Sequence, residues 1–214
     1  HAASGQKLSG NETRNLNRAY PGRPDGTYTE KVAFAITELI KKNDIKMTID
    51  LHEASPEYPV INAIVAHERA MAISSQVVMN MEFEDIQIGL EPSPATLHGL
   101  THRELGDYTC TCAVLMETAN ASQGRLRGKT DADLVLTGKD PMYVKAQKIG
   151  RLFVPYDEKG HPIEERVGRH LTGVVQHILV MGENEPDNEI ILEGLPSYAE
   201  LLENGVGAYL KEVK

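Results

Sequence analysis

The sequence predicts an α/β fold with a mostly parallel or mixed central sheet flanked by helices. In some segments the apolar residues recur with helical spacing; in others they alternate with polar residues or run together. Segments of the two kinds interleave along the chain, which is typical of strands connected by helices. The 214 residues, of which 41% are hydrophobic and 25% charged, have the composition of an ordinary globular protein.

The expected strands are short and bounded by polar or turn-forming residues. Residues 110–116 are nearly all apolar or β-branched, as in an interior strand of a sheet that is covered on both faces. The other expected strands are 45–51, 60–65 and 86–90. Helices are expected from an N-cap at Thr29 to a stop at Asn43-Asp44, and over roughly 66–81, 164–180 and 197–204.

The chain is expected to form one main domain with a tail. Residues 1–181 are the expected α/β domain, and residues 182–214 a helical tail packed on it. Within the domain, residues 119–162 show no clean period and are interpreted as a long excursion with short strands at 133–136 and 151–155. The excursion is either a lid or a small β appendage, and the sequence leaves both open.

Charge and cysteine content narrow the partners. The formal net charge of −9 argues against a nucleic-acid or anionic-membrane partner, since both need a positive surface. No apolar run reaches the ~18 residues that span a bilayer. Cys110 and Cys112 are interpreted as free thiols on one strand face, which favours a reducing, cytoplasmic location. The oligomeric state stays open.

Two residues at expected strand ends form a candidate site. His52 follows the strand that ends at Leu51, and Glu117 follows the strand that ends at Met116. Ligands of open α/β sheets gather at the carboxyl ends of strands. A carboxylate that emerges from a buried apolar strand lies in low dielectric, which makes it a better proton acceptor. The alternative is that His52 is an ordinary loop histidine and Glu117 a surface carboxylate.

A third motif adds a family resemblance. Residues 15–22, Asn-Leu-Asn-Arg-Ala-Tyr-Pro-Gly, resemble the Asn-Arg loop of the zinc carboxypeptidase superfamily, and are most similar to its succinylglutamate desuccinylase/aspartoacylase branch. Asp50-Leu51-His52 is similar to that family's zinc-ligand strand end. Glu117, in Leu115-Met116-Glu117-Thr118, stands where the family has its general base, and the three motifs come in the family's order.

The resemblance implies a function and a role for each matched residue. Asn17 and Arg18 would hold the substrate's carboxylate, because a guanidinium matches a carboxylate bidentately. His52 would bind Zn²⁺, and Glu117 would act as the general base. The implied protein is a zinc-dependent hydrolase of zinc carboxypeptidase-like fold that cleaves an amide bond of an N-acyl amino acid or another small carboxylate-bearing substrate. The alternatives are a metallocarboxypeptidase that acts on peptides, or a metal-free carboxylate-binding relative.

The chain departs from the family at the first zinc ligands. The family places His-x-x-Glu upstream of the Asn-Arg loop, whereas residues 9–12 here read Ser-Gly-Asn-Glu. The literal match at residues 161–164, His-Pro-Ile-Glu, follows Glu117 and is out of order. A chain that opens on His1 is therefore expected to begin downstream of the His-x-x-Glu segment.

Two further features hold candidate residues. His98 and His102 are four residues apart, but Pro92, Pro94 and Gly99 make that stretch a poor helix for a metal pair. In the family, the segment before the general-base strand carries Arg or Tyr residues that contact substrate. Arg103 and Tyr108 fall in that segment here.

Overall fold

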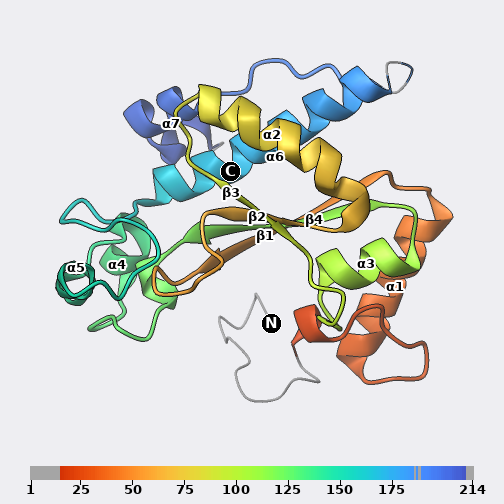
Figure 1. Cartoon of the computed structure of the whole chain (residues 1–214), viewed down its shortest axis with the longest axis horizontal. Coiled ribbons are helices and arrows are strands. Elements are labelled where there is room, and N and C mark those ends of the chain that lie inside the picture. The colour runs from red at the N-terminus through yellow and green to blue at the C-terminus, as the bar shows by residue number, and fades with distance from the viewer. Residues whose placement is uncertain (1–14, 186, 188, 211–214) are drawn as a thin grey trace. The chain divides into compact units, whose positions relative to one another are not determined.

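The computed structural model describes residues 15–185, 187 and 189–210, and they form an α/β arrangement of strands and helices (Figure 1). The motif at residues 9–12 lies outside the described residues. The strands are β1 (Met47–Ala54), β2 (Ala63–Ala66), β3 (Gly89–Pro92) and β4 (Cys112–Ala119). The α-helices are α1 (Tyr28–Lys42), α2 (Met71–Phe83), α3 (Thr101–Tyr108), α4 (Ala132–Thr137), α5 (Pro141–Lys148), α6 (Ile163–Asn184) and α7 (Tyr198–Asn204).

The four strands form one mixed sheet in the order β1-β4-β2-β3. Strands β1 and β4 are parallel. The Cys112 amide donates to the Lys46 carbonyl at 2.8 Å before the strands, and the Asn120 amide donates to the Ala54 carbonyl at 2.8 Å after them. The carboxyl ends of β1 and β4 therefore lie at the same edge of the sheet. The prediction of an α/β fold with a parallel or mixed sheet flanked by helices is confirmed.

Strands β2 and β3 run antiparallel to β1 and β4. The amide of Gly89 donates to the carbonyl of Asn62 at 2.7 Å, and the amide of Ser93 donates to the carbonyl of Ala66 at 2.8 Å. These bonds make β3 parallel to β2, while β2 is antiparallel to β4. All four observed strands overlap the predicted ones, although each begins two or three residues later than predicted.

The chain divides into two compact units, and each strand passes from one into the other. The first unit comprises residues 1–50, 65–71 and 92–115, and the second comprises residues 51–64, 72–91 and 116–214. His52 and Glu117 both belong to the second unit, whereas Asn17 and Arg18 belong to the first.

Helix α1 of the first unit is fixed at its start by a capping box. The Glu30 amide donates to Thr27 Oγ1 at 3.3 Å, and the Thr27 amide donates to Glu30 Oε2 at 2.7 Å. The prediction of Thr29 as the N-cap is therefore wrong by two residues, because Glu30 stands three positions after Thr27 and completes the reciprocal pair. Ala33 and Ile40 of α1 then pack against Leu105 of α3 in the core of this unit.

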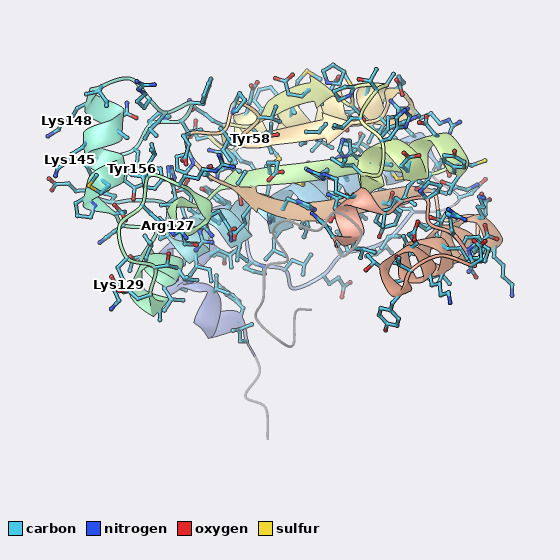
Figure 2. All side chains as sticks on the ribbon, turned by 90° about the horizontal axis from the view of Figure 1, so that it is seen from below. Tyr58, Arg127, Lys129, Lys145, Lys148 and Tyr156 are labelled. Atoms are coloured by element: carbon cyan, nitrogen blue, oxygen red, sulfur yellow. The ribbon has the colours of Figure 1, made fainter. Side chains whose placement is uncertain are left out.

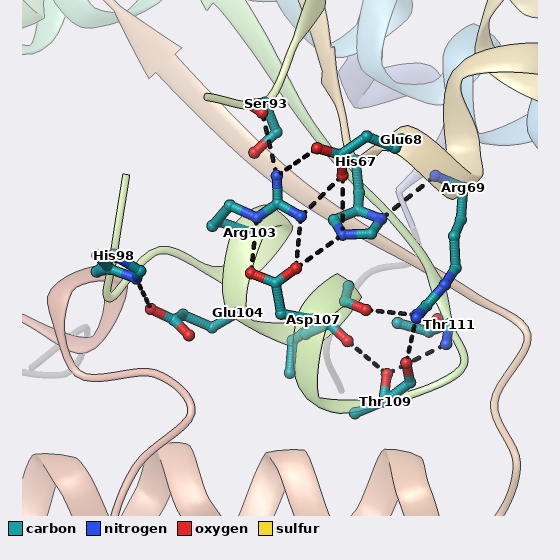
Figure 3. A network of polar contacts seen from close by, with 12 residues as sticks. His67, Glu68, Arg69, Ser93, His98, Arg103, Glu104, Asp107, Thr109 and Thr111 are labelled. Atoms are coloured by element: carbon teal, nitrogen blue, oxygen red, sulfur yellow. Dashed lines mark hydrogen bonds and ion pairs between the residues drawn. The ribbon is translucent and has the colours of Figure 1, made fainter. Parts of the chain in front are cut away.

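A buried guanidinium joins α3 to the segment after β2 (Figure 3). Arg103, only 3% exposed, donates from Nη2 to Glu68 Oε2 at 2.8 Å and to Asp107 Oδ1 at 2.6 Å. Arg103 Nη1 also reaches the Ser93 carbonyl at 3.2 Å. The ring of His67 lies 3.1 Å from both carboxylates. This network holds helix α3 in place because a buried guanidinium must keep its acceptors.

The network gives the first unit an acid-sensitive contact. The hydrogen bond from Arg103 holds the pKa of Glu68 at about 2, well below its ordinary value, and it also lowers the pKa of Asp107. A carboxyl whose folded pKa is depressed stabilises the fold above its unfolded pKa of about 4.3, and that contribution is lost as the pH falls towards 2. We expect the wild type to lose more stability between these pH values than an Arg103→Met variant does, as measured by urea unfolding. Equal losses in the two proteins would contradict this role.

The excursion of the second unit is helical where strands were predicted. Residues 133–136 lie within α4, so the strand prediction there is wrong. The Asp131 side chain accepts from the Leu134 amide at 3.0 Å, and Gly138, at φ +63°, ends the helix. Residues 151–155 are irregular, so the strand prediction there is wrong too; the Arg151 amide donates to the Ala146 carbonyl at 3.0 Å and the Phe153 amide to the Pro56 carbonyl at 2.9 Å.

The same excursion is anchored to the loop that follows β1. The hydroxyl of Tyr143, a fully buried residue of α5, donates to Glu57 Oε2 at 2.6 Å. The other oxygen of Glu57 accepts from the Arg125 amide at 2.8 Å. Val154 and Ile61 pack with Ala119 at the end of β4. The excursion therefore rises beside the carboxyl ends of β1 and β4.

Helices α6 and α2 lie antiparallel in the second unit (Figure 1). Asn80 donates to Gln176 at 2.9 Å, and Gln76 donates to Glu183 at 2.8 Å. A Cβ added at Gly173 would lie 2.2 Å from the side chain of Met116, so α6 can approach β4 closely only because this position is glycine. The late helices predicted at 164–180 and 197–204 are confirmed.

Candidate functional site

His52 and Glu117 lie side by side at the edge where β1 and β4 end. The distance from His52 Nδ1 to Glu117 Oε1 is 3.9 Å, and the two side chains are 31% and 13% exposed. The sequence predicted that both residues follow their strands. Strand β1 continues to Ala54 and β4 to Ala119, so both residues lie inside their strands instead. Adjacent parallel strands still bring the imidazole and the carboxylate to one face.

Glu53 follows His52 in β1, points to the opposite face of the strand, and anchors the strand to α6 and to the residue after β4. Its carboxylate accepts from Arg166 Nη1 of α6 and from Asn120 Nδ2 at 2.7 Å. Arg166 is itself 3% exposed and also donates to the His161 carbonyl at 3.1 Å. This ion pair, of which the guanidinium is buried, fixes the end of β1 against α6 and the residue after β4, and so holds the backbone that carries His52.

His170 of α6 is a further imidazole beside the two site strands. Burial lowers the pKa of His170, against the opposing effect of the Glu53 carboxylate and of the nearby backbone of Met116 and His52. The ring is therefore neutral near pH 7. The sequence pattern did not indicate His170. It stands in the inward-facing run of α6, three residues after Val167 and four before Val174, and only this helical spacing could have pointed to it.

Asn17 and Arg18 belong to the first unit, in a short 3-10 helix (Leu16–Arg18). The Asn17 side-chain oxygen accepts from the Thr101 amide at 2.7 Å, and the Thr101 hydroxyl donates to Asp50. Arg18 donates from Nη1 to the Asn17 carbonyl at 2.6 Å and is exposed. The Asn-Arg loop thus has a defined anchor at the N-terminus of α3, with its guanidinium at the surface.

The loop depends on a glycine that faces it. Gly99 has φ +86°, and a Cβ there would lie 2.7 Å from the Arg18 carbonyl oxygen. A backbone hydrogen bond joins the same two segments, because the Tyr20 amide donates to the Gly99 carbonyl at 3.2 Å.

We expect Gly99→Ala to displace the Asn-Arg loop, and to lower stability by about 1–3 kcal/mol, because it adds a backbone clash to the strain of a positive φ. Gly150→Ala is the matched control. Gly150 also has a positive φ, of +66°, but a Cβ there meets no atom within 4 Å. The measurement is urea unfolding of both variants. Equal losses would show that the contact with Arg18 adds nothing.

The other candidates do not gather at this site. Helix α3 forms from Thr101, so the expectation that this stretch is a poor helix is wrong from that residue on. His102 lies on the helix and His98 before it, and their spacing does not put them on one helical face. Arg103 serves the buried network, and Tyr108 is 54% exposed.

The His161-x-x-Glu164 match does not form a ligand pair. His161 Nδ1 lies 3.5 Å from Oε1 of Glu165, the residue after Glu164, and Arg169 donates to that same oxygen at 2.9 Å. Glu165 is therefore engaged in an ion pair, which holds its pKa at about 2 despite burial.

The donor set fits zinc only in part. Catalytic zinc sites usually have three protein ligands and one open position. The part of the chain that the structure describes contains no group of three His, Cys, Asp or Glu side chains that could hold a metal ion. His52 can supply one imidazole, and a complete site needs further ligands from outside these residues.

The comparisons with known proteins leave the family open. No protein-family model, curated protein or solved structure matches the chain. Within the described residues, no helix combines the length and the apolar character needed to cross a bilayer. Functional inference therefore depends on the site itself.

Proposed function

We propose that this chain belongs to a zinc-dependent hydrolase of zinc carboxypeptidase-like fold, which cleaves an amide bond of an N-acyl amino acid or a similar small carboxylate-bearing substrate. The observation that carries the proposal is the approach of His52 and Glu117 to 3.9 Å on adjacent parallel strands. Such a pair places a metal-binding imidazole beside a proton acceptor. The three motifs, in the order Asn-Arg, His and Glu, support the same assignment.

Glu117 is assigned the proton transfers. Its carboxylate is 13% exposed and lies 3.9 Å from His52 Nδ1. It takes a proton from the attacking water and returns that proton to the leaving amine, so that one group serves as base and then as acid. A zinc ion held partly by His52 would lower the pKa of bound water and polarise the scissile carbonyl.

Asn17 and Arg18 are assigned to the substrate's carboxylate. Arg18 lies at the surface, a guanidinium matches a carboxylate in its geometry, and Thr101 fixes the orientation of the Asn17 amide. Anchoring a charged group away from the reacting bond orients that bond, and positioning of this kind can contribute several kcal/mol to catalysis.

The test is zinc analysis combined with a panel of N-acyl amino acids. We expect the intact protein to bind zinc stoichiometrically and to release free amino acid, and His52→Ala to lose both zinc and activity. His98→Ala is the matched control and should retain both, because the His98 side chain is 76% exposed and lies in the other unit. Zinc binding that survives His52→Ala would remove His52 from its role.

The metal-free alternative has one observation in its favour, the incomplete donor set among the described residues. A carboxylate-binding relative would bind N-acyl amino acids without hydrolysing them and without zinc. Calorimetric titration of the zinc-free protein with the same panel separates the two. Binding with no turnover after zinc is added would favour the binding protein over the hydrolase.

A further inference from the structure

The second unit has strongly separated charges. The excursion, residues 121–162, contains eight Lys or Arg and five Asp or Glu. Residues 72–91 contain four acidic residues and no Lys or Arg, and residues 170–210 contain seven acidic residues and again no Lys or Arg. The excursion is thus a basic region in a chain with a net charge of −9, and it belongs to the same unit as these acidic segments.

Part of the basic region consists of the last turns of α5 and the segment that follows it. We name this part the basic tip: Lys145, Lys148, Ile149, Arg151 and Phe153. Figure 2 shows the side chains of Lys145 and Lys148 extending outward from α5. Ile149 is 71% exposed and Phe153 is 63% exposed. A Cβ at Gly150 would have open space around it, so the turn is not packed at this point. The tip therefore presents apolar side chains within a positive surface.

The complementary surface, the acidic face, consists of Glu82, Phe83, Glu84, Asp85 and Glu183. Phe83 is the most exposed of the large apolar side chains in the described residues, at 89%. Gln176 donates to Glu84 at 2.9 Å and Gln76 donates to Glu183 at 2.8 Å, so the carboxylates of α2 and α6 lie along one helix pair. The acidic face therefore combines an exposed aromatic ring with negative charge, whereas the tip combines apolar side chains with positive charge.

We propose that the basic tip of one copy of this chain binds the acidic face of a second copy. The argument is complementarity: each surface combines exposed apolar side chains with charges of one sign, and the signs are opposite. Neither the three basic residues of the tip nor Glu82 and Asp85 of the face makes an ion pair within the described part of the chain. Because two different surfaces meet, the contact either occurs twice in a closed two-fold dimer or repeats head to tail and extends to larger assemblies.

The association is expected to depend on salt. At about 0.15 M salt the Debye length is ~8 Å, so the facing charges still attract while the repulsion between two negatively charged chains is largely screened. At about 0.5 M salt the attraction weakens as well. Sedimentation velocity over a concentration series should therefore show self-association at the lower salt concentration and much less at the higher one.

Charge reversal tests the two surfaces separately. Lys145→Glu with Lys148→Glu, and Glu82→Lys with Asp85→Lys, are each expected to weaken self-association about tenfold or more, because like charges then face each other. An equimolar mixture of the two variants should associate again, since each retains one native surface that matches the other's. The control is Lys31→Glu with Lys42→Glu on α1, which changes the net charge as much as the tip variant does, at exposed residues of the first unit.

Each outcome of these experiments either supports or overturns the proposed self-association. Loss in both reversal variants, recovery in their mixture and no change in the control support the proposal. A wild type that stays monomeric over the concentration series at about 0.15 M salt overturns it. Self-association that is unaffected by the tip variant, or that the control weakens equally, also overturns it, because net charge or another surface would then be responsible.

Discussion

Replacing Glu117 with Gln is expected to lower kcat by about 10²–10⁴-fold and to leave KM nearly unchanged. Glutamine has almost the same size, and its amide can occupy the place of the carboxylate on β4 beside His52. It cannot accept a proton from water. The loss should therefore fall on the chemical step, which a steady-state assay of amino-acid release from an N-acyl amino acid measures directly.

The control for this substitution is Glu91→Gln. Glu91 is also a strand carboxylate, but it is exposed on β3, an edge strand of the sheet. We expect its kcat to match that of the wild type. If Glu117→Gln also hydrolyses the substrate at the wild-type rate, Glu117 is not the general base, and the assignment of roles at this site fails.

Replacing Arg103 with Met is expected to lower the free energy of unfolding by about 1.5–3 kcal/mol, the range for lost hydrogen bonds to charged groups. Methionine fills much of the same space but donates to neither Glu68 nor Asp107, so α3 would lose its link to the segment after β2. The loss stays below that of a fully buried ion pair because the Glu68 and Asp107 side chains are 63% and 39% exposed and water can solvate them. The measurement is urea unfolding followed by two probes, so that loss of cooperativity between the units is detected.

Arg23→Met is the matched control. Arg23 pairs with Asp25 at 3.4 Å, but these side chains are 65% and 74% exposed. An exposed pair contributes about 0–1 kcal/mol, so this variant should remain close to the wild type. A loss for Arg103→Met no larger than that of the control would show that the network in Figure 3 contributes little to stability.

Much of the fold could be predicted from local patterns. Strands β1 and β4 and helix α6 were predictable because their apolar patterns are strong, and helix α7 begins with a capping box of Ser197 and Glu200. The strand predicted at 133–136 failed because Leu134-Val135-Leu136 has strand-like composition, while the cap at Asp131 and the glycine at 138 decide for a helix. Helix α3 was missed because its buried charges are stabilised by partners such as Glu68, which stands 35 positions away.

The candidate site shows the same division. The approach of His52 to Glu117 could be expected from two adjacent strand ends. The support from Glu53 and Arg166 could not, because those residues stand 113 positions apart and only the packing of α6 brings them together. The position of His170 beside the site could not be predicted for a related reason: the local sequence around a histidine in an apolar helical run does not indicate which distant residues lie beside it.

The central claim is that His52 and Glu117 act as one catalytic unit, and a double-mutant cycle on kcat/KM tests it most directly. The cycle compares His52→Ala, Glu117→Gln and the double variant with the wild type, each with the same N-acyl amino acid. Residues that serve one step are strongly non-additive, so we predict that the double variant is about as slow as the slower single variant. Losses that multiply would mean that the two residues act independently, and would contradict the account.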